Sequence, residues 1–189
     1  MSVRETYSHL QRDAVDVLEC WPPPDDEQEQ LRQQYLDHLR AHPEAVARSG
    51  PPAHLTASCL VLSSDGEHVL LTHHRRAGRW FQFGGHLEPT DTCVWSAARR
   101  EGREESGIED LDPLPRPVHL DRHLLDGDFG RCREHLDVRY AALAPAGSRP
   151  RVGSESIDVR WWRVDELPDG TRADLGPLIS LARSVLGHR

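Results

Sequence analysis

Three carboxylates within five residues are the clearest chemical feature of this sequence. Glu101, Glu104 and Glu105 are spaced i, i+3 and i+4, and residues at these spacings share one face of a helix. Carboxylates held so close together repel one another unless a cation compensates them. A divalent metal would do so, and oxygen ligands suit Mg²⁺ or Mn²⁺ better than Zn²⁺. Arginines also interleave with these glutamates, so a solvated face of ion pairs is the alternative interpretation.

The residues on both sides of the glutamates favour a binding site. Gly84-Gly85 comes first, and glycines place no side chain in the way of a close backbone approach. A helix is predicted over 92–105, and Gly107 stands where a left-handed glycine cap would end it. A glycine bend and a capped helix would therefore place the three carboxylates around one small volume.

The stretch Gly85–Ile108 resembles the signature of the Nudix hydrolase family, G-x5-E-x7-R-E-U-x-E-E-x-G-U, in which U is an aliphatic residue. Arg100-Glu101 takes the R-E position, and Glu104-Glu105-Ser106-Gly107-Ile108 takes E-E-x-G-U. The resemblance covers roughly His54 to Pro168.

Three positions depart from this signature. Asp91 stands where the first glutamate belongs, and eight residues instead of seven separate it from Arg100. These two departures occur together in a branch of the family. In addition, Gly102 replaces the usual aliphatic residue, which loosens the helix by about 1 kcal/mol relative to alanine.

The resemblance implies a pyrophosphohydrolase that uses Mg²⁺, with Mn²⁺ as a substitute. The substrate would be a small molecule with a diphosphate linkage, typically a nucleoside diphosphate attached to another group. Glu104 would either bind the ion directly or lie just behind the ligands. The implied metal ligands are Glu101, Glu104, Glu105 and the backbone carbonyl of Gly84.

The same resemblance implies a catalytic set, in which Arg100 orients the loop carboxylate of Asp91. A general base must lie within hydrogen-bond reach of the attacking water, and Glu104 and Glu155 are both candidates. The implied catalytic residues are Glu101, Glu104, Arg100 and Glu155. Arg75, Arg76 and Arg79 are weaker candidates for the substrate phosphates, because the arginine fork suits phosphate. An exposed loop is their alternative role.

Two other functions are compatible with the signature. A non-catalytic Nudix-fold module would bind a nucleotide as a sensor, but such modules usually lose one or more of the carboxylates, and all three helix carboxylates remain here. Isomerase chemistry on an isoprenoid diphosphate would need a cysteine in a T-x-x-C-S-H-like strand. Cys93 instead begins the helix, and Cys59 has no adjacent Ser-His.

Hydrophobic periodicity predicts the elements that must position these residues. Helices are predicted over 7–21, 26–42, 92–105 and 175–186, and strands over 55–62, 69–72, 80–83, 118–125 and 135–143 and around Trp161-Trp162, with a turn at Asp126-Gly127-Asp128. This alternation implies an α/β fold, and the resemblance implies a Nudix-type α/β/α sandwich around a mixed sheet. We interpret residues 1–50 as an N-terminal helical extension that covers the core, and residues 51–189 as the hydrolase domain. A substrate lid or a dimer contact is the alternative role of the extension.

Composition limits the cellular compartment and the binding partners that we expect for this protein. The chain has 189 residues and a formal net charge of −8, which argues against general nucleic-acid binding. No apolar run approaches the roughly 20 residues that span a bilayer, and the N-terminus lacks the apolar stretch of a secretory signal. Four cysteines without a C-x-x-C pair indicate a reduced compartment. Twelve histidines form no helical zinc pattern. We therefore expect a cytoplasmic protein without a membrane partner, compatible with a homodimer, the commonest soluble assembly.

Overall fold

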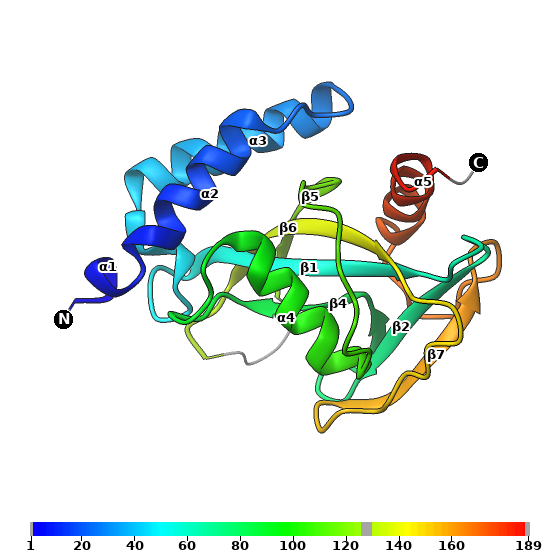
Figure 1. Cartoon of the computed structure of the whole chain (residues 1–189). Helices are drawn as coiled ribbons and strands as arrows, with labels where there is room; N and C mark the ends of the chain where they lie inside the picture. Colours follow the sequence, from blue (N-terminus) through cyan, green and yellow to red (C-terminus); the bar gives the residue numbers. More distant parts are fainter. Residues whose placement is uncertain (1, 126–129, 188–189) are drawn as a thin grey trace.

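The computed structural model describes residues 2–125 and 130–187, so the predicted turn at Asp126-Gly127-Asp128 lies outside the described residues. A seven-stranded sheet lies between helices (Figure 1). The strands are β1 (Ala53–Leu62), β2 (His68–His74), β3 (Arg79–Phe81), β4 (Phe83–His86), β5 (His119–Leu124), β6 (Glu134–Leu143) and β7 (Ser156–Arg163). The helices are α1 (Val3–Thr6), α2 (Ser8–Cys20), α3 (Asp26–Ala41), the 3-10 turn η1 (Pro43–Val46), α4 (Val94–Ser106) and α5 (Leu175–Val185).

The sheet is mixed, as the sequence predicts. Its main order is β3-β2-β1-β6-β5, with β4 paired to β1 and β7 paired to β2. The long central pair β1–β6 is parallel, whereas the pairs of β1 with β2 and β4 are antiparallel. The helix and strand positions predicted from periodicity agree with the structure to within a few residues, except that the strand predicted over 80–83 divides into β3 and β4.

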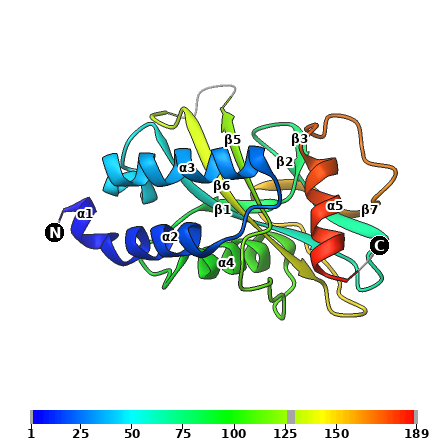
Figure 2. The ribbon, with the colours of Figure 1, turned by 90° about the horizontal axis from the view of Figure 1, so that it is seen from above.

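Alternation along β1 separates the two apolar layers. Leu55 and Ala57 join the core cluster that packs α2, α3 and α4 against the sheet. Leu60 and Leu62 point the other way and join the cluster beneath α5, because successive strand residues face opposite sides. Helices on both sides of the sheet confirm the predicted α/β/α sandwich. In Figure 2, α2 and α3 run side by side at one end of the molecule and α5 lies at the other end.

The N-terminal helices contribute to the main core. Leu10 and Leu18 of α2 and Tyr35 and Leu39 of α3 are fully buried in the same cluster as the apolar face of α4. The Tyr35 hydroxyl donates to the backbone oxygen of Asp121 at 2.8 Å, which ties α3 to the edge strand β5. No helix in the described ranges is both long and apolar enough to cross a membrane.

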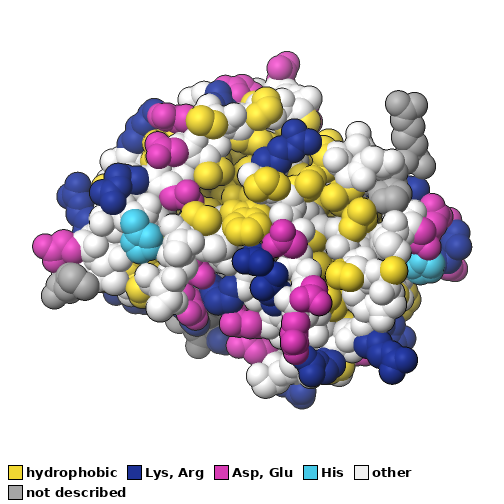
Figure 3. Space-filling model, in the orientation of Figure 1, with side chains coloured by type: hydrophobic (Ala, Val, Ile, Leu, Met, Phe, Trp, Pro, Cys, Tyr) yellow, Lys and Arg dark blue, Asp and Glu magenta, His cyan; other side chains and the backbone are white. Residues whose placement is uncertain are grey.

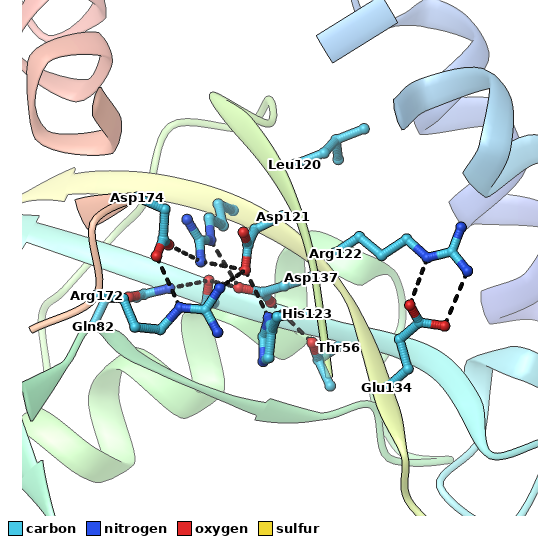
Figure 4. A network of polar contacts seen from close by, with 12 residues as sticks. Thr56, Gln82, Leu120, Asp121, Arg122, His123, Glu134, Asp137, Arg172 and Asp174 are labelled. Atoms are coloured by element: carbon cyan, nitrogen blue, oxygen red, sulfur yellow. Dashed lines mark hydrogen bonds and ion pairs between the residues drawn. The ribbon is translucent and has the colours of Figure 1, made fainter. Parts of the chain in front are cut away.

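A buried ion-pair network replaces apolar packing on part of the α5 side of the sheet (Figure 4). Arg139 on β6 has a side chain only 2% exposed. Its guanidinium lies 2.8 Å from Asp121, 3.1 Å from Asp137 and 2.7 Å from Asp174. Arg172 adds a 2.8 Å contact to Asp174. The network joins β5 and β6 to the segment that leads into α5.

The network sets the ionisation of Asp121. Burial opposes its negative charge, but the hydrogen bond from His123 and the positive charge of Arg139 outweigh burial and lower the pKa of Asp121 to about 2. A carboxyl group with a pKa below its unfolded value stabilises the fold above that unfolded value, about 3.9. This contribution is lost as the pH falls through about 2.

We expect Arg139→Ala to lower the free energy of unfolding by about 3–5 kcal/mol at pH 7, because buried carboxylates lose their cation. Without Arg139 these carboxyl groups have raised pKa values, so they protonate more readily at low pH. The loss relative to wild type should therefore be smaller at pH 5 than at pH 7. Urea unfolding at the two pH values measures both effects.

Arg122→Ala is the matched control, because Arg122 lies on the neighbouring β5 strand and pairs with Glu134 at the exposed edge. Its removal should cost less than about 1 kcal/mol at either pH. Equal losses in the Arg139 and Arg122 variants would contradict the structural role of the network.

Candidate functional site

Two glycines bring the backbone of β4 close to its neighbours. Gly84 pairs with Ser58 of β1, and a Cβ atom on Gly84 would lie only 2.4 Å from the Ser58 Cβ. A Cβ atom on Gly85 would lie 2.6 Å from Oε1 of Glu101. Neither position can hold a larger residue without moving its neighbours. Gly84 therefore lets β4 lie close to β1, and Gly85 lets the Glu101 carboxylate of α4 approach β4 directly.

The ends of α4 are fixed from several directions. Cys93 is the N-cap residue, and the Val94 amide donates to Oδ2 of Asp13 on α2 at 2.6 Å. Gly107 ends the helix with φ at 69°, which confirms the predicted left-handed glycine cap. Sequence reasoning missed Asp13, because it lies 81 residues from its partner along the chain.

Gly102 has a packing role. A Cβ atom there would lie 3.0 Å from Cδ2 of Leu111 and 3.2 Å from Cβ of Cys59. Gly102 therefore lets α4 lie close to β1 and to the segment after the helix. This close approach explains why glycine stands at a position where the signature has an aliphatic residue.

Arg100 connects the parts of the site. Its guanidinium donates to both oxygens of Asp91 at 3.0 Å each and to the backbone oxygen of His86 at 3.0 Å. It also lies 2.8 Å from Oε1 of Glu101 and 3.4 Å from Oε2 of Glu104. The contact with Asp91 expected from the sequence is present, and so is the ion pair with Glu104. A bidentate pair of this kind fixes both direction and distance.

Asp91 also shapes its own loop. Its Oδ2 atom accepts a hydrogen bond from the Glu88 amide at 2.7 Å, and its side chain is buried. The backbone oxygen of Asp91 lies 2.8 Å from Nε2 of His9 on α2. Aspartate, although shorter than the glutamate of the signature, thus fits this position. It accepts one hydrogen bond from the loop backbone and two from the Arg100 guanidinium.

Glu105 is the most perturbed carboxyl group of the site. Burial raises its pKa to about 8, although the Gly84 amide donates a hydrogen bond to Oε2 at 2.9 Å. The negative charges of Glu101, Glu155 and Glu104 raise the pKa further. Four carboxyl groups therefore share one electrostatic environment, which is the condition in which a divalent cation binds favourably.

Glu101 lies deeper than its neighbours on the same helix. Its side chain is 15% exposed, and burial raises its pKa even though the charge of Arg100 opposes the shift. Acidic and basic side chains interleave on the surface over α4 (Figure 3). The site therefore combines a partly buried pair, Glu101 and Glu105, with solvated charges around it.

The two candidate bases lie at the solvent side of this pair. The side chain of Glu104 is 62% exposed and that of Glu155 is 75% exposed. Oε2 of Glu155 lies 4.0 Å from Nε2 of His74. Both carboxylates therefore reach solvent, and both lie near enough to Glu105 for their charges to raise its pKa.

The basic loop lies next to Glu155. The Arg75 amide donates to the backbone oxygen of Glu155 at 2.9 Å, and its guanidinium donates to the backbone oxygen of Ser156 at 2.9 Å. Arg75 thus holds the beginning of β7 in addition to its predicted phosphate role. Arg76 and Arg79 are exposed beside it.

An open groove runs along the C-terminal end of α4, next to the exposed Glu104. Arg151 lines it with a side chain 68% exposed. Arg151 lies in a loop without a motif, so its sequence context predicts no role for it. The residues lining the groove are Arg103, Glu104, Gly107, Glu109, Arg151, Val152 and Gly153.

Comparison with known proteins identifies the fold. The sequence model of the NUDIX domain family matches residues 52–181 of the chain. A NUDIX-family hydrolase from Clostridium perfringens shares 21% identity, with 71% of this chain and 96% of that chain covered and a TM-score of 0.54. An Ap4A hydrolase from C. elegans, in a binary complex, shares 18% identity over 70% and 97% of the two chains, with a TM-score of 0.57.

A third solved structure has the same architecture. The dihydroneopterin triphosphate pyrophosphohydrolase of E. coli shares 17% identity over 67% of this chain and 92% of its own, with a TM-score of 0.55. The search of curated proteins found no significant match. At these identities the structures establish a common fold, and the fold predicted from the sequence is confirmed.

We expect Arg100→Lys to weaken Mn²⁺ binding by about 10-fold or more and to lower stability by about 1–3 kcal/mol, because lysine cannot hold both oxygens of Asp91. Calorimetric titration and thermal unfolding measure the two effects. Arg99→Lys is the control on the same helix, since Arg99 pairs with the exposed Asp112. Unchanged Mn²⁺ affinity in a folded Arg100→Lys variant would contradict the positioning role.

Proposed function

The chain belongs to the Nudix hydrolase family, and we propose that it is a Mg²⁺-dependent pyrophosphohydrolase that cleaves a diphosphate linkage in a small nucleotide-type molecule. Glu101 and Glu105 hold the metal together with the backbone carbonyl of Gly84. Glu104 joins them as a ligand or as a neighbour of the ligands. Mn²⁺ substitutes for Mg²⁺, because both ions prefer oxygen donors.

The position of Glu105 is the observation that carries this proposal: it is half-buried, lies among the charges of Glu101, Glu104 and Glu155, and its pKa is raised by burial. A purely structural carboxylate would gain stability from an arginine partner, but Arg100 turns to Asp91, Glu101 and Glu104. Glu105 accepts a hydrogen bond from the Gly84 amide and has no ion-pair partner among the described residues. A partly buried carboxyl group that lies among three others favours binding of a divalent cation, because the cation reduces the repulsion between the carboxylates.

The reaction adds water across a phosphoanhydride bond, so that one P–O bond forms and another breaks. A bound divalent metal neutralises phosphate oxygens and makes water more acidic. Glu104 or Glu155 accepts the proton of the attacking water, since each carboxylate reaches solvent beside Glu105. Arg100 keeps Asp91 and Glu101 in place during this step.

The proposed substrate is anionic. It reaches the site from the solvent-exposed side, where Glu104 and Glu155 lie. Arg75, Arg76 and Arg79 supply positive charge near Glu155, and Arg151 supplies it along the groove beside Glu104. Two fold relatives are named for nucleotide-type phosphoanhydrides, Ap4A and dihydroneopterin triphosphate. These names support a nucleotide-type compound as the substrate class.

Residues 1–50 serve in this proposal as a helical extension that covers the core of a hydrolase domain formed by residues 51–189. The shared core of α2, α3 and α4 supports a structural role. So do the contacts of His9 with Asp91 and of Asp13 with Val94. Through them the extension stabilises the loop and the first turn of the helix that carries the carboxylates.

We also propose that the protein acts in the cytoplasm. All four cysteines, Cys20, Cys59, Cys93 and Cys132, are free thiols, as is usual in a reducing compartment. That the protein forms a homodimer stays a prediction, which rests on the high frequency of homodimers among soluble oligomers.

We expect Glu105→Gln to lower kcat for diphosphate hydrolysis in Mg²⁺ by about 100-fold or more, because a metal ligand is removed. The variant should fold, since glutamine resembles the neutral form that burial favours. A panel of nucleotide sugars, dinucleoside polyphosphates, nucleoside triphosphates and capped RNA, assayed for phosphate-containing products, measures the effect and identifies the leaving group.

Glu109→Gln is the matched control, because Glu109 is an exposed glutamate just beyond the same helix and pairs with the exposed Arg151. It should retain wild-type kcat. Full activity of a folded Glu105→Gln variant would overturn the ligand assignment. Tight nucleotide binding by the wild type without turnover of any compound would instead favour the sensor function.

A further inference from the structure

A second group of metal-ligating side chains lies on the α5 side of the sheet, outside the carboxylate site. It consists of His54 on β1, His86 on β4, His135 on β6 and Cys132 in the turn before β6, and we call it the His/Cys cluster. Strand pairing brings the members together, because His54 pairs directly with His135 and β4 lies on the other side of β1. Two of the four residues are buried and two are half-buried.

The spacing of the donor atoms matches a small tetrahedral site. One donor atom from each residue lies within 4.8 Å of all the others. Nε2 of His86 is 3.0 Å from Nε2 of His54 and 3.9 Å from Sγ of Cys132. A zinc ion bound by nitrogen at about 2.0 Å and sulfur at about 2.3 Å needs donor separations of roughly 3.3–3.7 Å. Side-chain shifts of about 1 Å therefore suffice to close the site.

Hydrogen bonding prepares the histidines as ligands. Nδ1 of His54 donates to the backbone oxygen of Pro51 at 3.0 Å, since a carbonyl can only accept. This bond leaves the Nε2 lone pair of His54 directed at the cluster, an arrangement that is common behind metal-bound histidines.

His135 supplies an independent sign of a missing ligand. Its Nε2 atom is buried and has no hydrogen-bond partner within residues 2–125 and 130–187. Leaving a buried polar atom without a hydrogen bond is unfavourable. Coordination of a metal would satisfy this atom and would also explain why three imidazoles and a thiol gather without a carboxylate among them.

We propose that His54, His86, Cys132 and His135 form a structural zinc site, distinct from the magnesium site on α4. Imidazole and thiolate donors select a borderline-soft ion such as Zn²⁺ over Mg²⁺. Four protein ligands leave no open position, which is the pattern of a structural site.

The zinc site would act on the catalytic region through one strand. The His86 side chain belongs to the cluster, while its backbone oxygen accepts the hydrogen bond from Arg100. Zinc would therefore fix the end of β4 just before the loop that carries Asp91. Cys132 would at the same time fasten the segment between β5 and β6 to the centre of the sheet.

The test uses full-length protein from which any histidine tag has been cleaved. Metal is removed with a chelator, and Co²⁺ or Zn²⁺ is then titrated in the presence of excess Mg²⁺. We expect one equivalent of Co²⁺ to bind with a cobalt–thiolate charge-transfer band and Zn²⁺ to raise the melting temperature. Cys132→Ser should lose the band and bind Zn²⁺ at least about 10-fold more weakly.

Cys20→Ser is the matched control, because Cys20 is an exposed cysteine on α2, and it should retain the band. Glu105→Gln should also retain it, which separates this site from the carboxylate site. If Cys132→Ser proves unfolded by circular dichroism, His135→Gln replaces it, with loss of the tetrahedral cobalt spectrum as the expected result. Absence of the thiolate band in wild type, or unchanged Zn²⁺ affinity in the folded variants, would show a hydrogen-bonded histidine cluster only and overturn the proposal.

Discussion

Repulsion among partly buried carboxylates on α4 is the constraint on which the candidate active site depends. Glu105 rests against the amide of Gly84, and Glu101 lies where a side chain on Gly85 would stand. Arg100 offsets part of the negative charge through Asp91, Glu101 and Glu104, while Glu105 pairs with no arginine in the part of the chain that the structure describes. The fold thus holds a charge distribution that is unfavourable alone and becomes favourable when a hard divalent ion binds.

The protein holds this arrangement from several sides. Gly102 allows α4 to lie close to β1, and Asp13 of α2 accepts a hydrogen bond at the beginning of the helix. The guanidinium of Arg100 connects the helix to Asp91 and to the end of β4. Stability of the core and geometry of the site are therefore linked, because the same close contacts serve both.

The opposite side of the sheet shows a different use of polar residues. Where α5 covers the strands, the core is apolar. Beyond α5, Arg139 with its aspartates and the His/Cys cluster occupy positions on the same strands. Buried polar groups are stable only when they have partners. Arg139 pairs with three aspartates of the chain, although its Nη1 atom has no hydrogen-bond partner among the described residues. The His/Cys cluster has converging donor atoms, and Nε2 of His135 likewise has no partner in the part of the chain that the structure describes.

The sequence by itself determined the elements, the signature helix with its glycine cap, the pairing of Arg100 with Asp91 and the family. These features depend on local periodicity and on residues close together in the chain, so their spacing is visible in the sequence. Only the tertiary structure decided why Gly102 is needed, how Asp13 reaches α4, and that His54, His86 and His135 meet. These contacts join residues separated by tens of positions, and strand pairing rather than chain order brings them within reach.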